Sequence, residues 1–221
     1  MLHLSRARRA VLSLTLALSL ASLAGCDDPT KGQAKANAAA PVASTAGSAV
    51  AGSTYAITPQ NSKVEWTGSK VTGHHDGSFG SFSGAITFVG GAIEKSRVTI
   101  DIDTPSLTTV PENLIHHLKT KDFFSVEEFP KATFASTSIK AGGGSADKPA
   151  GFQITGNLTL HGVTKSISFP ANIAVVGDAV NADATFSINR KDFNINYPGK
   201  VDDVIRDDVL IKLTLHATKT P

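Results

Sequence analysis

The 221-residue sequence predicts an all-β protein, an antiparallel sandwich or closed barrel of about eight strands with one short helix. Two observations lead to this class. Apolar and polar residues alternate in short segments between residues 64 and 215, whereas only one segment has helical spacing. Alternation of this kind is typical of antiparallel strands with one buried and one wet face. The alternating apolar residues are Val64, Trp66, Ile86, Phe88, Val98, Ile100, Ile102, Ile167, Phe169, Phe186, Ile188, Val209, Ile211, Leu213 and Leu215.

The connections between the strands are marked by glycine and polar residues. Residues 161–164 (HGVT) predict a short hairpin loop, and residues 141–151 (AGGGSADKPAG) predict a longer, looser one. Both a sandwich and a closed barrel would bury the apolar strand faces, and alternation does not decide between them. If the sheet closes into one barrel, its interior is either filled by side chains or holds one small ligand.

The helix is expected to begin near Thr109. Thr-Val-Pro-Glu, residues 109–112, has the pattern of a capping box, with a proline tolerated in the first turn. Leu114, Ile115 and Leu118 then form an apolar stripe, and residues 122–124 end the segment. Because a helix this short is marginal alone, we expect it to pack against the sheet.

Residues 1–25 have the organisation of an export signal. Arg6, Arg8 and Arg9 precede a short apolar core, and small residues follow that core. The core is too short to span a bilayer, which takes about 20 apolar residues. We therefore expect residues 1–25 to be a signal peptide that is removed on export.

Cys26, the only cysteine, directly follows this signal. Leu-Ala-Gly-Cys, residues 23–26, resembles the lipobox of bacterial lipoproteins. That resemblance implies cleavage before Cys26, a diacylglycerol on its sulfur and anchoring of the chain to a membrane through Cys26. In enterobacterial-type sorting, an aspartate at the position of Asp27 favours the inner membrane. The alternative is a secreted protein with an unmodified cysteine.

Residues 26–53 are expected to be the lipidated Cys26 and a flexible tether. Residues 27–53 contain no aromatic residue, leucine or isoleucine, and small residues and proline dominate them. Such a segment buries too little apolar surface to offset its ordering entropy. The globular domain is therefore expected to cover residues 54–221.

The charge balance argues against a nucleic-acid partner. Residues 1–25 carry three arginines and no acidic residue, so their removal shifts the net charge from +2 to −1. A nucleic-acid-binding domain would need a basic patch. With no second cysteine, the chain forms no internal disulfide and no cysteine metal cluster.

Several motifs between residues 55 and 217 resemble the YceI-like family. They occur in the family's order and together span nearly the whole expected domain. The motifs are WTGSK (66–70), HHDG (74–77), FSG (82–84), HLKTKDFF (117–124), FPKATF (129–134), GNLTLHGVTK (156–165) and INRKDF (188–193). The resemblance implies an extended, lipocalin-like antiparallel β-barrel with a long apolar pocket for a polyisoprenoid chain, such as an isoprenoid quinone. Its members are typically periplasmic or otherwise exported, and no other cofactor is expected.

The inward strand faces supply the walls that such a ligand needs, which are aliphatic and aromatic with few polar groups. From the residues alone, these side chains could equally pack against one another and fill the barrel. The resemblance favours the hollow alternative. The expected pocket residues are Trp66, Ile86, Phe88, Ile100, Ile102, Phe134, Leu158, Leu160, Phe169, Phe186, Ile188 and Leu213.

Arg190 is the polar residue most relevant to the pocket. It has the same strand parity as Phe186 and Ile188, so an unbroken strand would turn it inward. A buried guanidinium needs a partner, either a ligand carbonyl or a carboxylate such as Asp192, Asp207 or Asp208. Both a structural role and contact with a ligand head group stay open.

The sequence contains no recognised enzyme signature. The pairs His74–His75 and His116–His117 are adjacent in sequence, so their side chains diverge and neither pair is a natural chelate. The glycine-rich phosphate loop and the serine nucleophile elbow are absent.

We therefore expect a periplasmic, membrane-anchored binding protein that stores, shields or carries its lipid. A stress-response envelope protein with a filled barrel and a metal-dependent enzyme using histidines are the alternatives. Some relatives are dimers, so a homodimer is a further open alternative.

Overall fold

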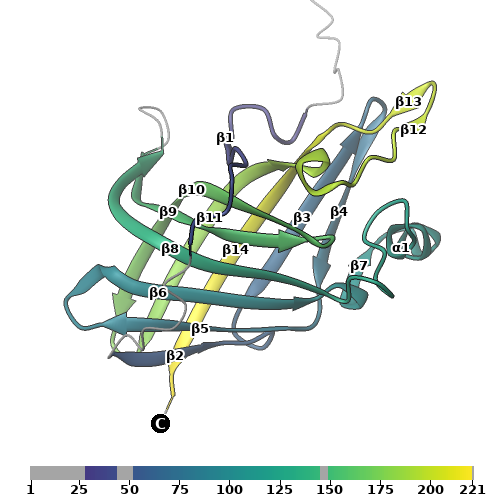
Figure 1. Cartoon of the computed structure of the whole chain (residues 1–221). Helices are drawn as coiled ribbons and strands as arrows, with labels where there is room; N and C mark the ends of the chain where they lie inside the picture. The colour runs from purple at the N-terminus through teal and green to yellow at the C-terminus, as the bar shows by residue number, and fades with distance from the viewer. Residues whose placement is uncertain (1–27, 44–51, 145–148, 221) are drawn as a thin grey trace, which may run out of the picture.

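The computed structural model describes residues 28–43, 52–144 and 149–220, which form one large twisted β-sheet that closes on itself (Figure 1). The signal segment 1–25, Cys26 and Asp27 lie outside the described residues. The strands are β1 (Ala34–Lys35), β2 (Ser53–Ile57), β3 (Lys63–Lys70), β4 (Gly73–Phe79), β5 (Phe82–Val89), β6 (Ala92–Asp103), β7 (Leu107–Thr109), β8 (Lys131–Gly144), β9 (Pro149–Leu160), β10 (Val163–Val176), β11 (Ala179–Asn189), β12 (Gly199–Lys200), β13 (Asp203–Val204) and β14 (Asp208–Lys219). The helices are α1 (Glu112–Lys119) and the short 3₁₀ helices η1 (Thr104–Ser106) and η2 (Arg190–Phe193).

The barrel is made of eight of the described strands in the order β2-β5-β6-β8-β9-β10-β11-β14. Each neighbouring pair is antiparallel, and the ring closes because β14 pairs with both β11 and β2. One edge of β14 pairs with β11, and the other edge pairs with two strands. On that edge, residues 210–214 pair with β3 and residues 218–219 pair with β2. This topology confirms the antiparallel barrel that the family resemblance implies, and it excludes the sandwich that the alternation left open.

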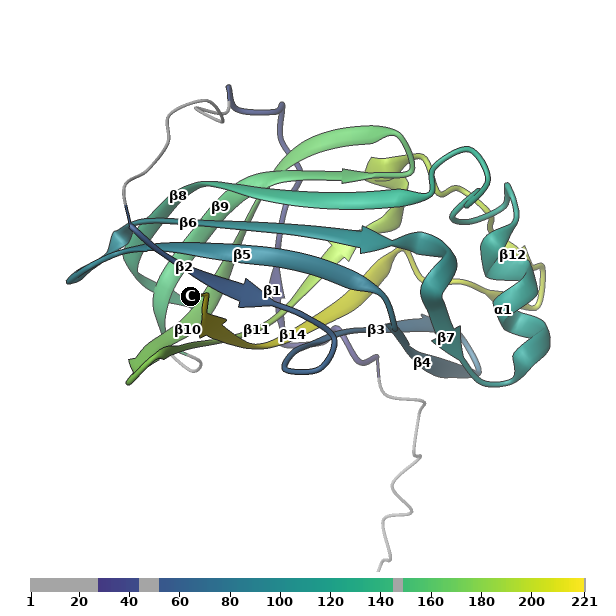
Figure 2. The ribbon, with the colours of Figure 1, turned by 90° about the horizontal axis from the view of Figure 1, so that it is seen from below.

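The two ends of the barrel are built differently (Figure 2). At one end lie α1, β7 and the small hairpin β12–β13, and we call this the α1 end. The tips of hairpins β5–β6 and β10–β11 lie at the opposite end. We call this the closed end, and a second cluster of buried side chains extends from Val180 near that end to Phe82, which pairs with Ile102. That cluster consists of Tyr55, Ile57, Val64, Phe82, Ile86, Ile100, Val180, Leu215 and Ala217.

The helix packs against the barrel as expected, but the predicted capping box is wrong. Leu118 is buried, and Leu114 and Ile115 pack against the main core cluster. Pro111 is the N-cap residue and no side chain caps the helix. Thr109 belongs instead to β7, where it pairs with Gly77, and its Oγ1 donates to the carbonyl of Asp76 at 2.6 Å. Sheet pairing therefore outcompetes local capping for this threonine.

Residues 28–43 differ from the flexible tether expected from their composition. β1 pairs in parallel with β11 through Ala34 and Lys35, Ala36 is only 1% exposed, and Ala39 forms a bridge with Ser166. The reason is a gap in the barrel wall: β10 and β11 pair only over residues 172–176 and 179–183. The free edges of the two strands beyond that point accept the alanine-rich segment (Figure 1).

The hairpin predicted at residues 161–164 is confirmed, with β9 ending at Leu160 and β10 beginning at Val163. His161 and Gly162 form the two-residue turn with φ values of 49° and 71°, which suits the twist of the flanking strands. The loop expected over residues 141–151 is shorter than predicted, because β8 continues to Gly144 and β9 begins at Pro149.

Candidate lipid-binding cavity

An apolar cavity of about 220 Å³ occupies the barrel interior, and its lining extends from α1 to Ile173 and Ala182 of the β10–β11 hairpin. Its wall is almost entirely apolar, although Glu65, Asp183 and Arg190 border it. A cavity without polar partners does not hold ordered water, since a buried water normally makes about three hydrogen bonds. The site therefore suits a hydrocarbon ligand better than a polar one.

Ten of the twelve predicted pocket residues line this cavity. Their inward orientation follows from the period of two along each strand. Ile86 and Phe88 instead line a small pocket of about 30 Å³ on the closed-end side. Phe88 there meets Tyr55 edge-to-face, with ring centroids 6.2 Å apart. The ten in the main cavity are Trp66, Ile100, Ile102, Phe134, Leu158, Leu160, Phe169, Phe186, Ile188 and Leu213.

Two glycines allow large aromatic rings to lie against the wall. A Cβ on Gly77 would come within 2.2 Å of the Trp66 ring, and one on Gly156 within 2.4 Å of the Phe134 ring. Real Cβ atoms essentially never approach so closely, so a larger residue at either position would push the ring toward the lumen. Both glycines belong to the family-like motifs, but the sequence does not show that they lie beneath these rings.

A second aromatic contact closes the wall where β10 and β11 separate. Phe169 on β10 and Phe186 on β11 stack with ring centroids 4.1 Å apart and planes 10° apart. Phe134 on β8 meets Phe169 at 5.6 Å. The segment 28–43 covers the outside of the same gap, where the outward-facing Ser166 and Ser187 are buried.

The residues around the α1 end were missed by the sequence analysis. Five side chains there line the cavity and come from α1, its following turn and the segments around β12–β13. Residues 122–124 were interpreted only as the end of the helix, because loop residues have no period that indicates an inward face. The five are Leu118, Phe123, Phe124, Ile195 and Ile205.

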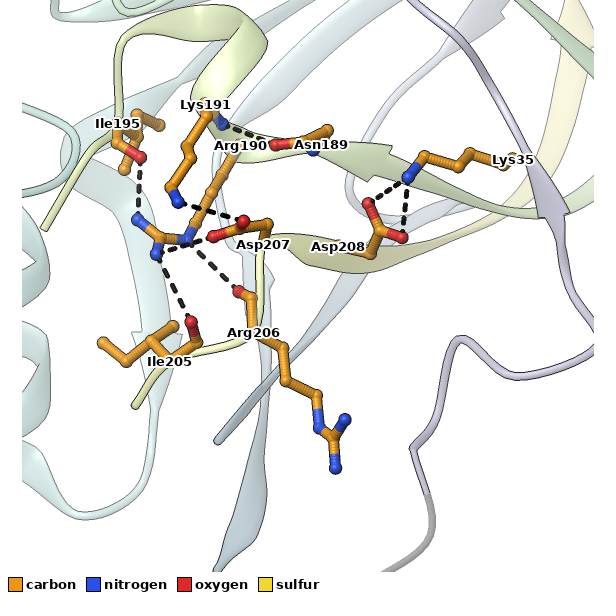
Figure 3. Close-up of polar contacts among 9 residues, drawn as sticks. All are labelled: Lys35, Asn189, Arg190, Lys191, Ile195, Ile205, Arg206, Asp207 and Asp208. Carbon is orange, nitrogen blue, oxygen red and sulfur yellow. Dashed lines mark hydrogen bonds and ion pairs between the residues drawn. The ribbon is translucent and has the colours of Figure 1, made fainter. Parts of the chain in front are cut away.

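Arg190 begins η2 immediately after β11, and its side chain is only 4% exposed (Figure 3). Nε donates to the carbonyl of Arg206 at 3.2 Å, and Nη1 donates to the carbonyl of Ile195 at 2.7 Å. Nη2 donates to the carbonyl of Ile205 at 3.4 Å and to Asp207 Oδ1 at 3.2 Å. Every guanidinium nitrogen thus has a protein partner, which favours the structural interpretation of Arg190.

The electrostatics of this network agree with a tightly held cation. Burial lowers the pKa of Arg190, whereas the charge of Asp207 and its hydrogen bond raise it. Asp207 also pairs with Lys191 at 3.0 Å. Of the other carboxylates considered as partners, Asp208 pairs with Lys35 of β1 at 2.8 Å (Figure 3). This second ion pair joins the start of β14 to β1 in the N-terminal segment.

Comparisons with known proteins agree with this geometry. A family model described as the YceI-like domain matches residues 55–217, which is well over half of the chain. The protein belongs to the YceI-like family.

Sequence relatives of this YceI-like protein occur in several bacteria. A UPF0312 protein of Pseudomonas putida (strain W619) is 32% identical over 142 residues, covering 62% of this chain and 71% of the relative. Protein YceI of Salmonella arizonae is 38% identical over 125 residues, covering 54% of this chain and 62% of the relative. Neither match covers the complete chain of the relative.

Solved structures with the same fold are also known. Burkholderia cenocepacia BcnA aligns with a TM-score of 0.63 and 25% identity, covering 73% of this YceI-like chain and 99% of BcnA. A polyisoprenoid binding domain from Saccharophagus degradans aligns with a TM-score of 0.59 and covers 75% of this chain and 98% of that domain. At 16% identity, the second likeness shows the fold alone.

Three histidines of this YceI-like barrel have separate partners. His117 pairs with Asp122 at 2.8 Å, and His161 contacts the carbonyl of Phe193 at 3.2 Å. His74 lies 3.8 Å from Asp76 at the surface. Within residues 28–43, 52–144 and 149–220, no three histidine, cysteine, aspartate or glutamate side chains meet in a metal-binding arrangement. The part of the chain described by the structure also contains no helix long and apolar enough to span a membrane.

Proposed function

We propose that this YceI-like protein binds the chain of a polyisoprenoid lipid, such as an isoprenoid quinone, inside its barrel. The observation that carries the proposal is the nearly all-apolar cavity of about 220 Å³. It is larger than the engineered aliphatic and aromatic cavity of about 150 Å³ that stays dry and binds benzene. A branched, unsaturated hydrocarbon chain supplies the contacts that such a wall lacks when it is empty.

The protein binds its ligand in this cavity without catalysing a reaction on it. Of the three charged residues that border it, Arg190 is held by protein carbonyls and Asp207. The relative from Saccharophagus degradans is described as a polyisoprenoid binding domain, which supports binding rather than catalysis. Storage, shielding and transport of the lipid are all compatible with such a site.

We further propose that the protein is a periplasmic lipoprotein anchored to a membrane through Cys26. The support comes from the sequence: an export signal ends at a lipobox-like tetrad, and Asp27 favours retention at the inner membrane. The intact mass of the membrane-extracted chain tests this proposal. A chain that begins at Cys26 and carries acyl groups is expected, and a Cys26→Ala variant should lack them.

The lipid-binding proposal is tested by purifying the full-length protein and extracting it with organic solvent. Mass spectrometry should show about one polyprenyl lipid per chain. A barrel that releases no lipid and ignores added quinone would favour the filled-barrel envelope protein. Bound zinc or iron, with a function lost on chelation, would favour the metal-dependent enzyme.

A matched pair of variants makes this test specific for the cavity. Ala184 lines the cavity on β11, whereas its neighbour Thr185 has the opposite strand parity. Ala184→Phe should fill the lumen and remove most of the extracted lipid while the barrel stays folded. Thr185→Phe adds a similar ring on the outer face and should leave the lipid content unchanged.

A further inference from the structure

Two hairpin tips at the α1 end expose three valines beside an ion pair between Lys70 and Asp203. The turn between β3 and β4 carries Val71, and the hairpin β12–β13 carries Val201 and Val204. The tips touch, because the Val71 amide donates to the Val204 carbonyl at 3.2 Å and Lys70 forms a bridge with Ile205. We call Val71, Val201 and Val204 the valine tip.

The three side chains of the valine tip are unusually exposed for apolar residues. Val71 and Val204 are 56% and 47% exposed, and Val201 is fully exposed. Scattered single apolar residues need no explanation, but neighbouring ones on touching loops suggest a contact with an apolar partner. The side chains adjoin the cavity wall, since Ile205 follows Val204 directly and lines the cavity.

The N-terminal segment indicates which partner this surface meets. The carboxylate of Asp28 pairs with Arg206 Nη1 at 3.3 Å, and the Arg206 amide donates to the Ser69 carbonyl at 2.8 Å. Asp28 is therefore tied through the Arg206 side chain to the segment that follows β13. Cys26 precedes Asp28 by two residues, and two residues of extended chain reach at most about 7 Å. Acyl groups on Cys26 would thus enter a bilayer at the same end of the barrel as the valine tip.

We propose that the valine tip inserts into the interface of a lipid bilayer and holds the α1 end of the barrel toward the membrane. This inference rests on the lipid anchor proposed at Cys26. The short connection to Asp28 leaves the barrel little freedom to turn its opposite end to the bilayer. In this orientation the cavity end faces the membrane, where a polyisoprenoid chain resides, so the lipid can pass between bilayer and cavity over a short distance.

The orientation is tested with an environment-sensitive dye on single cysteines in the full-length protein. Val71→Cys and Val201→Cys report on the valine tip. Val176→Cys is the control, because Val176 is 60% exposed on hairpin β10–β11 at the opposite end. The labelled proteins are reconstituted in vesicles of phosphatidylethanolamine and phosphatidylglycerol. Acylated Cys26 has no free thiol and does not take the dye.

The dye at positions 71 and 201 should shift its emission to the blue and be quenched by a quencher attached to the lipid acyl chains. The dye at position 176 should behave as in water. Water-like emission at 71 and 201, or an equal shift at 176, would overturn the orientation. Val71→Asp combined with Val204→Asp should abolish the shift at 201, whereas Val175→Asp combined with Val176→Asp should preserve it.

The same preparation separates this inference from the proposals on which it rests. The intact mass shows whether Cys26 is acylated, and organic extraction shows whether the cavity holds a lipid. If Cys26 carries no acyl group, its free thiol would take the dye, so the labelled variants are remade with Cys26→Ala and added to preformed vesicles of the same composition. A shift at 71 and 201 but not at 176 would then still support the valine tip as a membrane surface, and equal emission at all three would refute it.

Discussion

Two regions of the barrel share the same alternation of apolar and polar residues, yet one is packed and the other borders a cavity. In the second buried cluster, Ile57 and Ala217 are completely buried among neighbouring side chains. Around the main cavity, the inward positions include small residues such as Ala132, Ala171 and Ala184. The comparison shows that alternation determines which side chains point inward, whereas their sizes determine whether any space is left.

The largest expected effect is a difference in stability between the packed cluster and the cavity wall. Ile57→Ala removes a side chain that is surrounded on all sides, so it should cost about 4 kcal/mol of unfolding free energy. Ile188→Ala removes a side chain that already borders empty space and has fewer contacts to lose, so about 2 kcal/mol is expected. Denaturant unfolding of lipid-free protein measures both. Equal costs would mean that the lipid-free barrel is filled.

Substitution of Arg190 gives the next largest effect, because Arg190 is a buried charge that borders the main cavity. Arg190→Met should cost about 3 kcal/mol, since it leaves the carbonyls of Ile195, Ile205 and Arg206 without their donor. Arg190→Lys should recover only part of this loss, because one ammonium group cannot reach all these acceptors. The variant that remains folded should still release lipid on extraction. Loss of lipid at unchanged stability would instead show that Arg190 contacts a ligand head group.

The inward strand faces could be predicted from the sequence, but the division of the barrel interior into a main cavity and a smaller pocket could not. Ten of the twelve predicted residues line the main cavity because strand parity is a local property. Ile86 and Phe88 have the correct parity but line the smaller pocket and not the main cavity. Their position along the barrel depends on strand register, which is set by tertiary pairing. The lining residues Ile195 and Ile205 lie outside the periodic strand segments, so alternation gave no signal for them.

Composition gave the wrong prediction for residues 28–43 for a related reason. A segment rich in alanine and glycine does not bury enough surface to fold alone. Its order comes from the free backbone edges of β10 and β11, which exist only because these strands diverge. Small side chains such as Ala36 then allow a close approach between the strands.

The contact of this segment with β9 predicts a smaller and local effect. The side-chain amide of Asn157 donates to the Val42 carbonyl at 2.8 Å, and its oxygen accepts from the Val42 amide at 3.1 Å. Asn157→Ala should therefore cost about 1 kcal/mol of local stability and speed hydrogen exchange in residues 28–43. Asn172→Ala is a matched control, since Asn172 accepts from Gly151. If both variants leave the exchange unchanged, Asn157 does not hold the segment.

The smallest expected effect is the response of the same segment to acid, and it concerns Asp28. Burial alone would raise the pKa of Asp28, but hydrogen bonds from Thr30 and the charges of Arg206 and Lys31 lower it below its ordinary value of 3.8. A lowered folded-state pKa means that the contribution of the carboxylate is complete above pH 3.8 and is lost as the pH falls through the folded-state value. The effect should be small because the ion pair is partly solvated. The amide resonances of Thr30 and Ala36 should shift together in an NMR titration below that pH, and Asp28→Asn should remove the transition. A transition that persists in Asp28→Asn would assign the acid response to another carboxylate, and the fixed position of the chain beside Arg206 would then need a different explanation.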